Sequence, residues 1–359
     1  MVLLGHLIED TALYAPWFFK YGWTGVNLFF SLSGFLFTYL YFDKFANNTQ
    51  SLKEYFLKRI IRIYPLTIFL VLVTVLTRSG YKFWDIFTHI TLINSYFKDY
   101  RFSINSPMWS LTVEESFYFL VPILLTVLGK IYEINWLKTT KAKIAFIAVV
   151  LFFIHGGFYN LATQIINLKY YFGGGWDSGF WSTTIFGRFF DFGIGITAGL
   201  IYLKLPNSRI FNKPIYSISL FVAGVSLWLF AANWYYQLGG PTPAGGHKLY
   251  SYYFLLFSIS ASLMILSLVG NSFIAKFFAL KPIVFAGKIS FALYLIQFMA
   301  ITGEKNLSKY LMRSLNYHLH NELLSLTLVC VILLILSTIL YFSIEMPAQK
   351  YLKKLLLKG

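Results

Sequence analysis

The sequence is short of charged residues. Of its 359 residues only 12% are Asp, Glu, Lys or Arg, whereas soluble domains carry about 25%. Acidic residues are especially few, 14 against 30 basic ones, while 57% of the chain is hydrophobic. This balance excludes an ordinary soluble domain and predicts an integral membrane protein.

Cysteine is almost absent, since Cys330 is the single one. A disulfide within the chain is therefore excluded. Cys330 lies in an apolar run, where a lone thiol packs more often than it reacts. The net charge of +16 does not indicate nucleic-acid binding. The basic residues lie between apolar runs, in the pattern of topology signals that face anionic lipid.

Crossing a bilayer takes about 20 apolar residues. We predict full spans at 22–42, 60–78, 107–128, 142–160, 185–203, 214–233, 249–269, 283–303 and 322–342. Residues 1–8 look like the second half of a further span, and 83–97 is weaker, as expected of an interfacial or re-entrant segment. The predicted fold is an all-α polytopic membrane helix bundle with nine full transmembrane helices plus a partial first one, in a single domain covering 1–359. We expect Pro347 to end the last span.

Most of the basic residues gather in one set of loops, which includes 58–62, 138–143 and 350–358. Lys and Arg are enriched in cytoplasmic loops of membrane proteins. The sequence therefore predicts a multi-pass protein of the inner (cytoplasmic) membrane, with its C-terminus on the cytoplasmic side.

Two adjacent carboxylates, Glu114 and Glu115, enter the span at 107–128. Ionisable groups inside a membrane are costly and usually functional. Helical spacing places Ser110, Glu114 and Tyr118 on one face, with Glu115 turned by about 100°. An ion pair between Glu114 and Arg188 is one account of the buried charge. Alternatively, Arg188 pairs with Asp191, three residues further along its own span.

Other spans carry polar faces that have a structural and a functional interpretation. Asn27, Ser31, Gly34 and Thr38 share a helical face, which favours close helix packing. The spacing of Ser290, Tyr294 and Gln297 likewise fits hydrogen bonds between helices. Arg59 and Arg62 share a face as well, either as positive-inside anchors or as a phosphate-binding cluster. The histidine spacing indicates no metal site.

In combination, these segments resemble the acyltransferase-3 family of membrane O-acyltransferases, in their order and spacing over essentially the whole chain. The resemblance rests on the segments 25–35, 58–65 and 109–118, on Arg188, Phe192 and Gly195, and on 289–295 and 345–347. The second segment reads Lys-Arg-Ile-Ile-Arg-Ile-Tyr-Pro, and the third contains Trp109, Ser110, Glu114, Glu115 and Tyr118. The family has a ten-helix bundle, so this fold is what the resemblance implies.

The resemblance also implies a reaction, the transfer of an acyl group, commonly acetyl, from acyl-CoA to a hydroxyl of a cell-surface or lipid-linked glycan. His6 matches the family's histidine and is expected to act as the base, with Glu114 as its catalytic partner. Lys58, Arg59 and Arg62 are expected to hold the phosphates of coenzyme A. The residues expected to bind substrate are Asn27, Ser31, Ser33, Trp109, Ser110, Glu115, Tyr118, Arg188, Tyr294 and Gln297. The expected partners are membrane lipid and the glycan acceptor, without nucleic acid and without a permanently bound cofactor.

The sequence departs from the family pattern at two places. The family places an Arg before its first His, with ten residues between them, and in this chain that Arg would precede Met1. We therefore expect 1–8 to be a remnant of the first span, because of either a late start or a truncation. Gln297 stands where many relatives carry His. The alternatives are a transporter or flippase of a lipid-linked sugar, with Glu114 as a proton-coupling site, and an inactive truncated relative.

Overall fold

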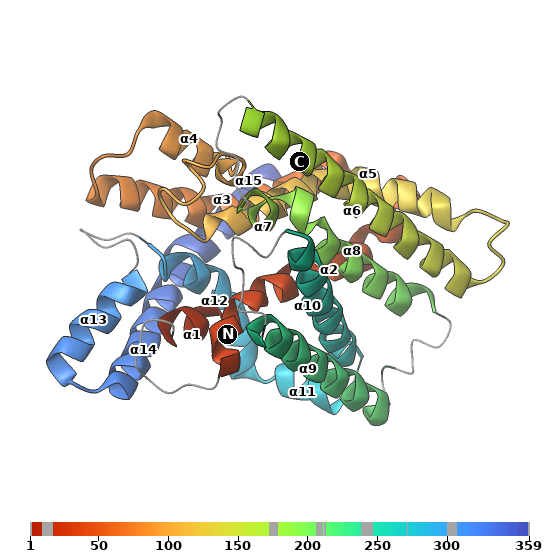
Figure 1. The fold of residues 1–359 in the computed structure, drawn as a ribbon. Coiled ribbons are helices and arrows are strands. Elements are labelled where there is room, and N and C mark those ends of the chain that lie inside the picture. Colours follow the sequence, from red (N-terminus) through yellow and green to blue (C-terminus); the bar gives the residue numbers. More distant parts are fainter. Residues whose placement is uncertain are drawn as a thin grey trace. The chain divides into compact units, whose positions relative to one another are not determined.

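The computed structural model describes residues 2–8, 17–171, 179–205, 211, 213–237, 247–270, 272–299 and 307–357 (Figure 1). Its regular elements within these ranges are helices, and none of the described residues forms a strand. The all-α prediction is confirmed for this part of the chain.

The chain forms two compact units built from interleaved segments of sequence. The first, called unit 1, comprises Met1–Trp23, Ser51–Thr112 and Lys281–Gly359, and unit 2 comprises Thr24–Gln50 and Val113–Leu280. Helix α5, Met108–Tyr132, passes from one unit into the other.

Unit 1 contains two long helices, α3 (Leu52–Thr77) and α14 (Glu322–Leu340). Its shorter elements are α1 (Val2–Ile8), η1 (Trp17–Thr24, whose last residue is in unit 2), α4 (Phe83–Ile90), η2 (Asn94–Tyr96), α12 (Lys281–Ile296), α13 (Leu307–Leu319), the π-helical turn η4 (Tyr341–Glu345) and α15 (Met346–Leu356). Capping side chains define where the long helices begin. Ser51 accepts a hydrogen bond from the Glu54 amide at 3.4 Å, and Asn321 accepts one from the Leu324 amide at 3.0 Å.

Unit 2 is built around α2 (Gly25–Ala46) and α8 (Ile185–Lys204). Its other elements are most of α5, α6 (Thr140–Tyr171), α7 (Gly179–Thr183), α9 (Pro214–Gln237), α10 (His247–Leu268) and α11 (Phe273–Phe278). Helix α8 packs against α2, α6 and α10, which places it in the interior of the unit.

Seven helices in the described part of the chain are long and apolar enough to cross a membrane, by length and composition. They coincide with seven of the nine predicted spans. The other two, 249–269 and 283–303, correspond to shorter apolar helices, Tyr253–Leu268 within α10 and the 16-residue α12. The polytopic membrane bundle is thus supported, and the number of nine stays a prediction.

The end of the last span differs from the sequence expectation, and the structure of the weaker segment 83–97 refines it. The last candidate span continues through η4 into α15, so the expectation that Pro347 ends it is wrong. Pro347 lies in the first turn of α15, directly after the π-helical turn η4, in which the Met346 N–H donates to the Tyr341 carbonyl. The weaker segment 83–97 contains α4, which at eight residues is too short to cross a bilayer. Phe83 and Trp84 of α4 are exposed, whereas His89 is buried.

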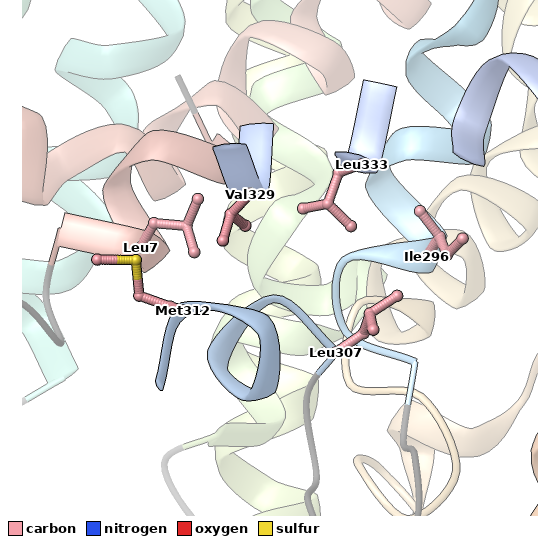
Figure 2. Packing of buried hydrophobic residues seen from close by; sticks show 6 residues of the cluster. All are labelled: Leu7, Ile296, Leu307, Met312, Val329 and Leu333. Atoms are coloured by element: carbon pink, nitrogen blue, oxygen red, sulfur yellow. The ribbon is translucent and has the colours of Figure 1, made fainter. Parts of the chain in front are cut away.

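The core of unit 1 joins its N-terminal helix to its C-terminal ones. Figure 2 shows the buried cluster formed by Leu7 of α1, Ile296 of α12, Leu307 and Met312 of α13, and Val329 and Leu333 of α14. Helix α1 is therefore anchored beside the C-terminal end of α12, through the residue that follows His6.

Small residues allow α2 and α8 to pack closely in unit 2. A Cβ at Gly34 would overlap the Phe192 carbonyl, and one at Gly195 would overlap the Ser31 carbonyl. The predicted small-residue face of α2 is thus confirmed as a packing face. Approach of this kind is typical of membrane helices, where small residues let backbones come together.

Replacing Gly195 by alanine should destabilise the protein by roughly 1–3 kcal/mol, because the added methyl group meets main chain that cannot rotate away. Gly193 on the same helix is the matched control, since its Cβ would meet only the Leu151 Cβ, at 3.7 Å. Thermal unfolding of both variants in detergent measures the difference. Equal melting temperatures would contradict the proposed contact between α2 and α8.

Candidate functional site

A buried carboxylate with two hydroxyl donors lies between α2 and α5 in unit 2. Glu114 is 5% exposed, and its Oε1 accepts hydrogen bonds from Ser33 Oγ, at 3.3 Å, and from the Tyr118 hydroxyl. Hydroxyl donors offset the desolvation of a buried carboxylate. The expectation that Glu114 and Tyr118 share a helical face is confirmed, and Ser33 joins them from the neighbouring helix.

A second polar cluster centres on α8 in the same unit. Arg188 Nε lies 3.0 Å from Asp191 Oδ2, and the two side chains are 2% and 1% exposed. Of the two accounts of Arg188, the local pair with Asp191 is therefore present. The guanidinium also lies over the Phe254 ring, at 4.1 Å from its centroid, so an aromatic face stabilises the cation as well.

Polar side chains of α2 and α10 complete this cluster around Asp191. Asn27 Nδ2 donates to Asp191 Oδ1 at 2.9 Å, the Ser258 hydroxyl donates to the same oxygen, and Ser31 Oγ donates to the Asp191 carbonyl at 3.1 Å. Asn27 and Ser31 thus connect α2 to α8 in this structure. Their role in binding substrate, like that of Arg188, stays a prediction.

Aromatic rings separate the two polar clusters of unit 2. Phe117 stacks on Phe192 with 3.9 Å between ring centroids, and Phe192 lies 4.9 Å from Phe30. On the other side, Phe37 lies 5.0 Å from the Tyr118 ring. The polar side chains of both clusters are buried, and hydrogen bonds are electrostatically stronger in such a surrounding than in water.

In unit 1 the predicted site residues of α12 meet the start of α5. The Tyr294 hydroxyl lies 2.9 Å from Ser110 Oγ and 3.3 Å from the Pro107 carbonyl. Gln297 is buried and donates from Nε2 to the Tyr294 carbonyl. The hydrogen bond expected between helices is confirmed for Tyr294, whereas the Gln297 side chain bonds a carbonyl of its own helix. Ser290 is exposed and bonds the Gly287 carbonyl instead.

The predicted phosphate-binding cations lie on one helix, α3. Lys58 pairs with Glu54 at 2.5 Å across a partly exposed helix surface. Arg59 is half-buried over the Tyr55 ring, and Arg62 is exposed. The arrangement leaves Arg62 accessible to an anion, and the binding of coenzyme A by these residues stays a prediction.

The two predicted catalytic residues belong to different units. His6 lies on α1 of unit 1, with its side chain outside the described residues, and Glu114 lies in unit 2. Trp109 is half-buried and Glu115 is buried, both on α5. The assignment of His6 as base and Glu114 as its partner stays a prediction.

Several buried polar residues in the segment between α4 and α5 were not predicted from the sequence. Asn94, Arg101 and Asn105 are all buried in unit 1. Asn105 Nδ2 donates to the Leu295 carbonyl at 3.0 Å, and Asn94 Nδ2 donates to the Arg101 carbonyl at 2.9 Å. Asn94 lies within the segment 83–97 that was expected to be interfacial or re-entrant, and its polarity there was the available signal; Arg101 and Asn105 follow that segment.

Comparison with known proteins identifies the class to which this helical membrane chain belongs. A family model described as an acyltransferase domain matches residues 1–342. The match covers nearly the whole chain, so the resemblance found in the sequence is confirmed. The chain belongs to the acyltransferase-3 family.

Similar individual proteins are O-acetyltransferases of Staphylococcus aureus. The chain is 24% identical over 301 residues to O-acetyltransferase OatA of strain NCTC 8325 / PS 47, covering 76% of this chain and 45% of OatA. It is 27% identical over 308 residues to the candidate O-acetyltransferase SACOL0978 of strain COL, covering 78% of this chain and 46% of that protein. The chain thus spans about half the length of these relatives. No solved structure matches it.

Proposed function

We propose that the chain is a membrane O-acetyltransferase that moves an acetyl group from acetyl-CoA to a hydroxyl of a cell-surface or lipid-linked glycan. The main support is the family match over residues 1–342, together with relatives named O-acetyltransferases. Buried polar side chains within apolar helices are consistent with this chemistry, because ionisable groups are retained in membranes where they have a function.

In the proposed reaction the acceptor hydroxyl attacks the thioester carbonyl carbon. His6 takes the hydroxyl proton as general base, the new ester C–O bond forms, and the C–S bond breaks. The proton then passes to the departing thiolate, so coenzyme A leaves as the thiol. Glu114 stabilises the imidazolium in this scheme, as a carboxylate beside a histidine does. Ser33 and Tyr118 hold its Oε1 in place.

The donor is held, in this proposal, by the cations of α3. Arg62 is exposed and Lys58 is partly exposed, so both side chains can reach a diphosphate outside the helix. Guanidinium groups bind phosphate oxygens through two parallel hydrogen bonds. Asn27, Ser31 and Ser33 are proposed to polarise the carbonyl or to contact the acceptor.

Transfer of a labelled acetyl group tests the function. The full chain in lipid nanodiscs is mixed with acetyl-CoA that carries carbon-14 in the acetyl group and with an isolated membrane glycan fraction. We expect label on the glycan that mild alkali releases, because esters are alkali-labile. A parallel sample in sealed proteoliposomes measures transport: glycan that crosses the membrane without acquiring label would refute the transferase and favour a transporter.

We also propose that the protein lies in the inner membrane with the C-terminus on the cytoplasmic side. In a Cys330→Ser background, a cysteine introduced at Lys353 of α15 should react with a membrane-impermeant maleimide only after the cells are permeabilised. The basic residues of α15 support this orientation. Labelling at this position in intact cells would contradict the proposed orientation and place the C-terminus on the outer side. A cysteine at Tyr317 of α13, which is exposed, serves as the comparison site.

A further inference from the structure

Two buried carboxamide side chains meet the C-terminal end of α12 in unit 1. Asn105 Nδ2 donates to the Leu295 carbonyl at 3.0 Å, and Gln297 Nε2 donates to the Tyr294 carbonyl at 3.2 Å. These carbonyls are consecutive in the chain, so the two amides lie at the same helix end. Asn105 is 2% exposed and Gln297 1%.

The bonds to the helix fix the orientation of both amides. A main-chain carbonyl only accepts hydrogen bonds, so the amide nitrogen must face it and the amide oxygen must point elsewhere. The last four carbonyls of a helix have no partner within the helix. Capping of the helix end therefore explains why the two amide nitrogens are placed here. It gives the two amide oxygens no structural role.

Neither oxygen has a hydrogen-bond partner among the described residues. Asn105 Oδ1 and Gln297 Oε1 are both buried acceptors of this kind, and burying such an atom unpaired is costly. Asn94, in the same unit, shows the usual outcome for a purely structural amide. Its Nδ2 donates to the Arg101 carbonyl and its Oδ1 accepts from Thr112 Oγ1, each at 2.9 Å.

We propose that the carboxamide oxygens of Asn105 and Gln297 form an acceptor pair that binds hydroxyl groups of the sugar acceptor. The identity of the ligand as acceptor rests on the proposed O-acetyltransferase function, whereas the binding of hydroxyl groups rests on the geometry. A pair of carbonyl-type oxygens requires a donor and repels phosphate or carboxylate. The ligand must therefore offer hydrogen-bond donors, and in the proposed reaction the hydroxyl groups of the sugar are such donors.

Two neighbouring features support a substrate hydroxyl at this helix end. The Tyr294 hydroxyl bonds Ser110 Oγ and the carbonyl of Pro107, which follows Asn105 by two residues, so a polar hydroxyl already lies near this part of the chain. Helix α1, which carries His6, packs into the same core cluster as Ile296, the residue before Gln297 (Figure 2). The helix of the proposed base and the acceptor pair thus lie in one part of unit 1. Water is the other source of a hydroxyl donor.

Binding of simple sugars, without turnover, tests the pair. Saturation-transfer NMR on the full chain in nanodiscs measures the Kd of methyl glucoside, galactoside, mannoside and N-acetylglucosaminide. The tightest of these is then compared with its monodeoxy analogues. We expect one deoxy analogue to bind wild type roughly five- to tenfold more weakly, as the loss of one hydrogen bond requires.

Each of the variants Asn105→Leu and Gln297→Met should weaken binding of the parent sugar by a similar factor. In the variant that lacks the oxygen bound by the deleted hydroxyl, the same deoxy analogue should cause no further loss. Asn94→Leu is the matched control, since it removes a buried amide whose oxygen is already paired. It should lower the melting temperature and leave the Kd unchanged. The deoxy comparison on wild type needs no variant, so it holds even where a variant fails to fold.

Three results would overturn the proposal. One is the absence of binding by all four glycosides. Another is equal affinity for every deoxy analogue. The third is a Kd that is unaltered in both variants, which would mean that water, and not the sugar, donates to the two oxygens. Deoxy-sensitive binding without acetyl transfer would instead refute the proposed function and support a sugar site. Acetyl transfer by wild type with an unaltered Kd in the variants would refute the acceptor pair alone.

Discussion

Asp191→Ala should cost about 3–5 kcal/mol of stability, because it leaves the Arg188 cation buried without its counter-ion. The pair lies in the interior of unit 2, with both side chains almost fully buried. The substitution also removes the acceptor for Asn27 and Ser258. Thermal and denaturant unfolding of the detergent-solubilised protein measure the loss, with retention on size-exclusion chromatography as the check on folding.

A second ion pair that involves α8, but is more exposed, provides the matched control. Lys204 of α8 pairs with Asp43 of α2 at 2.5 Å, but Asp43 is 60% exposed. Exposed pairs contribute about 0–1 kcal/mol, so Asp43→Ala should have little effect. Removing both buried charges, as Arg188→Met with Asp191→Leu, should recover part of the stability that Asp191→Ala loses. Equal losses for the buried and the exposed pair would show that burial does not govern the energetics here.

Interactions within one helix could be predicted from the sequence. Arg188 and Asp191 are three residues apart, and Glu114 and Tyr118 are four apart, so helical geometry alone brings each pair together. The small-residue face of α2 was also predictable, since its residues recur with the period of the helix. Membrane spans followed from apolar length, because the bilayer fixes how long such a helix must be.

Contacts between distant segments could not be predicted. Ser33 and Glu114 are 81 residues apart, Asn27 and Asp191 are 164 apart, and Asn105 and Leu295 are 190 apart. Periodicity identifies the face on which a side chain lies, but not the helix that this face meets. Asn27 could therefore be placed on a packing face of its helix, but Asp191 could not be identified as its hydrogen-bond partner. The same limitation hid Asn105, which lies outside any regular helix.

His6→Ala should reduce kcat by a factor of about 100 or more and leave the KM for acetyl-CoA nearly unchanged. A general base typically contributes about 10²–10⁴ in rate, and the donor is proposed to be held by other residues, on α3. The proposed base must be neutral to take a proton, so the pH profile of wild-type kcat should have an acidic limb that His6→Ala removes. The acetyl-transfer assay across pH 5–9 measures both effects.

His89→Gln is the control for this variant. His89 is buried on α4, its Nδ1 contacts the Asp85 carbonyl at 2.8 Å, and burial lowers its pKa to about 4. Its titration therefore lies below the pH range of the assay, and the variant should keep the wild-type profile. If His6→Ala retains both the rate and the acidic limb, the base must be sought elsewhere. Glu114→Gln then tests the carboxylate separately. A lower kcat would support a role of Glu114 in the reaction. An unchanged kcat would leave Glu114 as a structural partner of Ser33 and Tyr118.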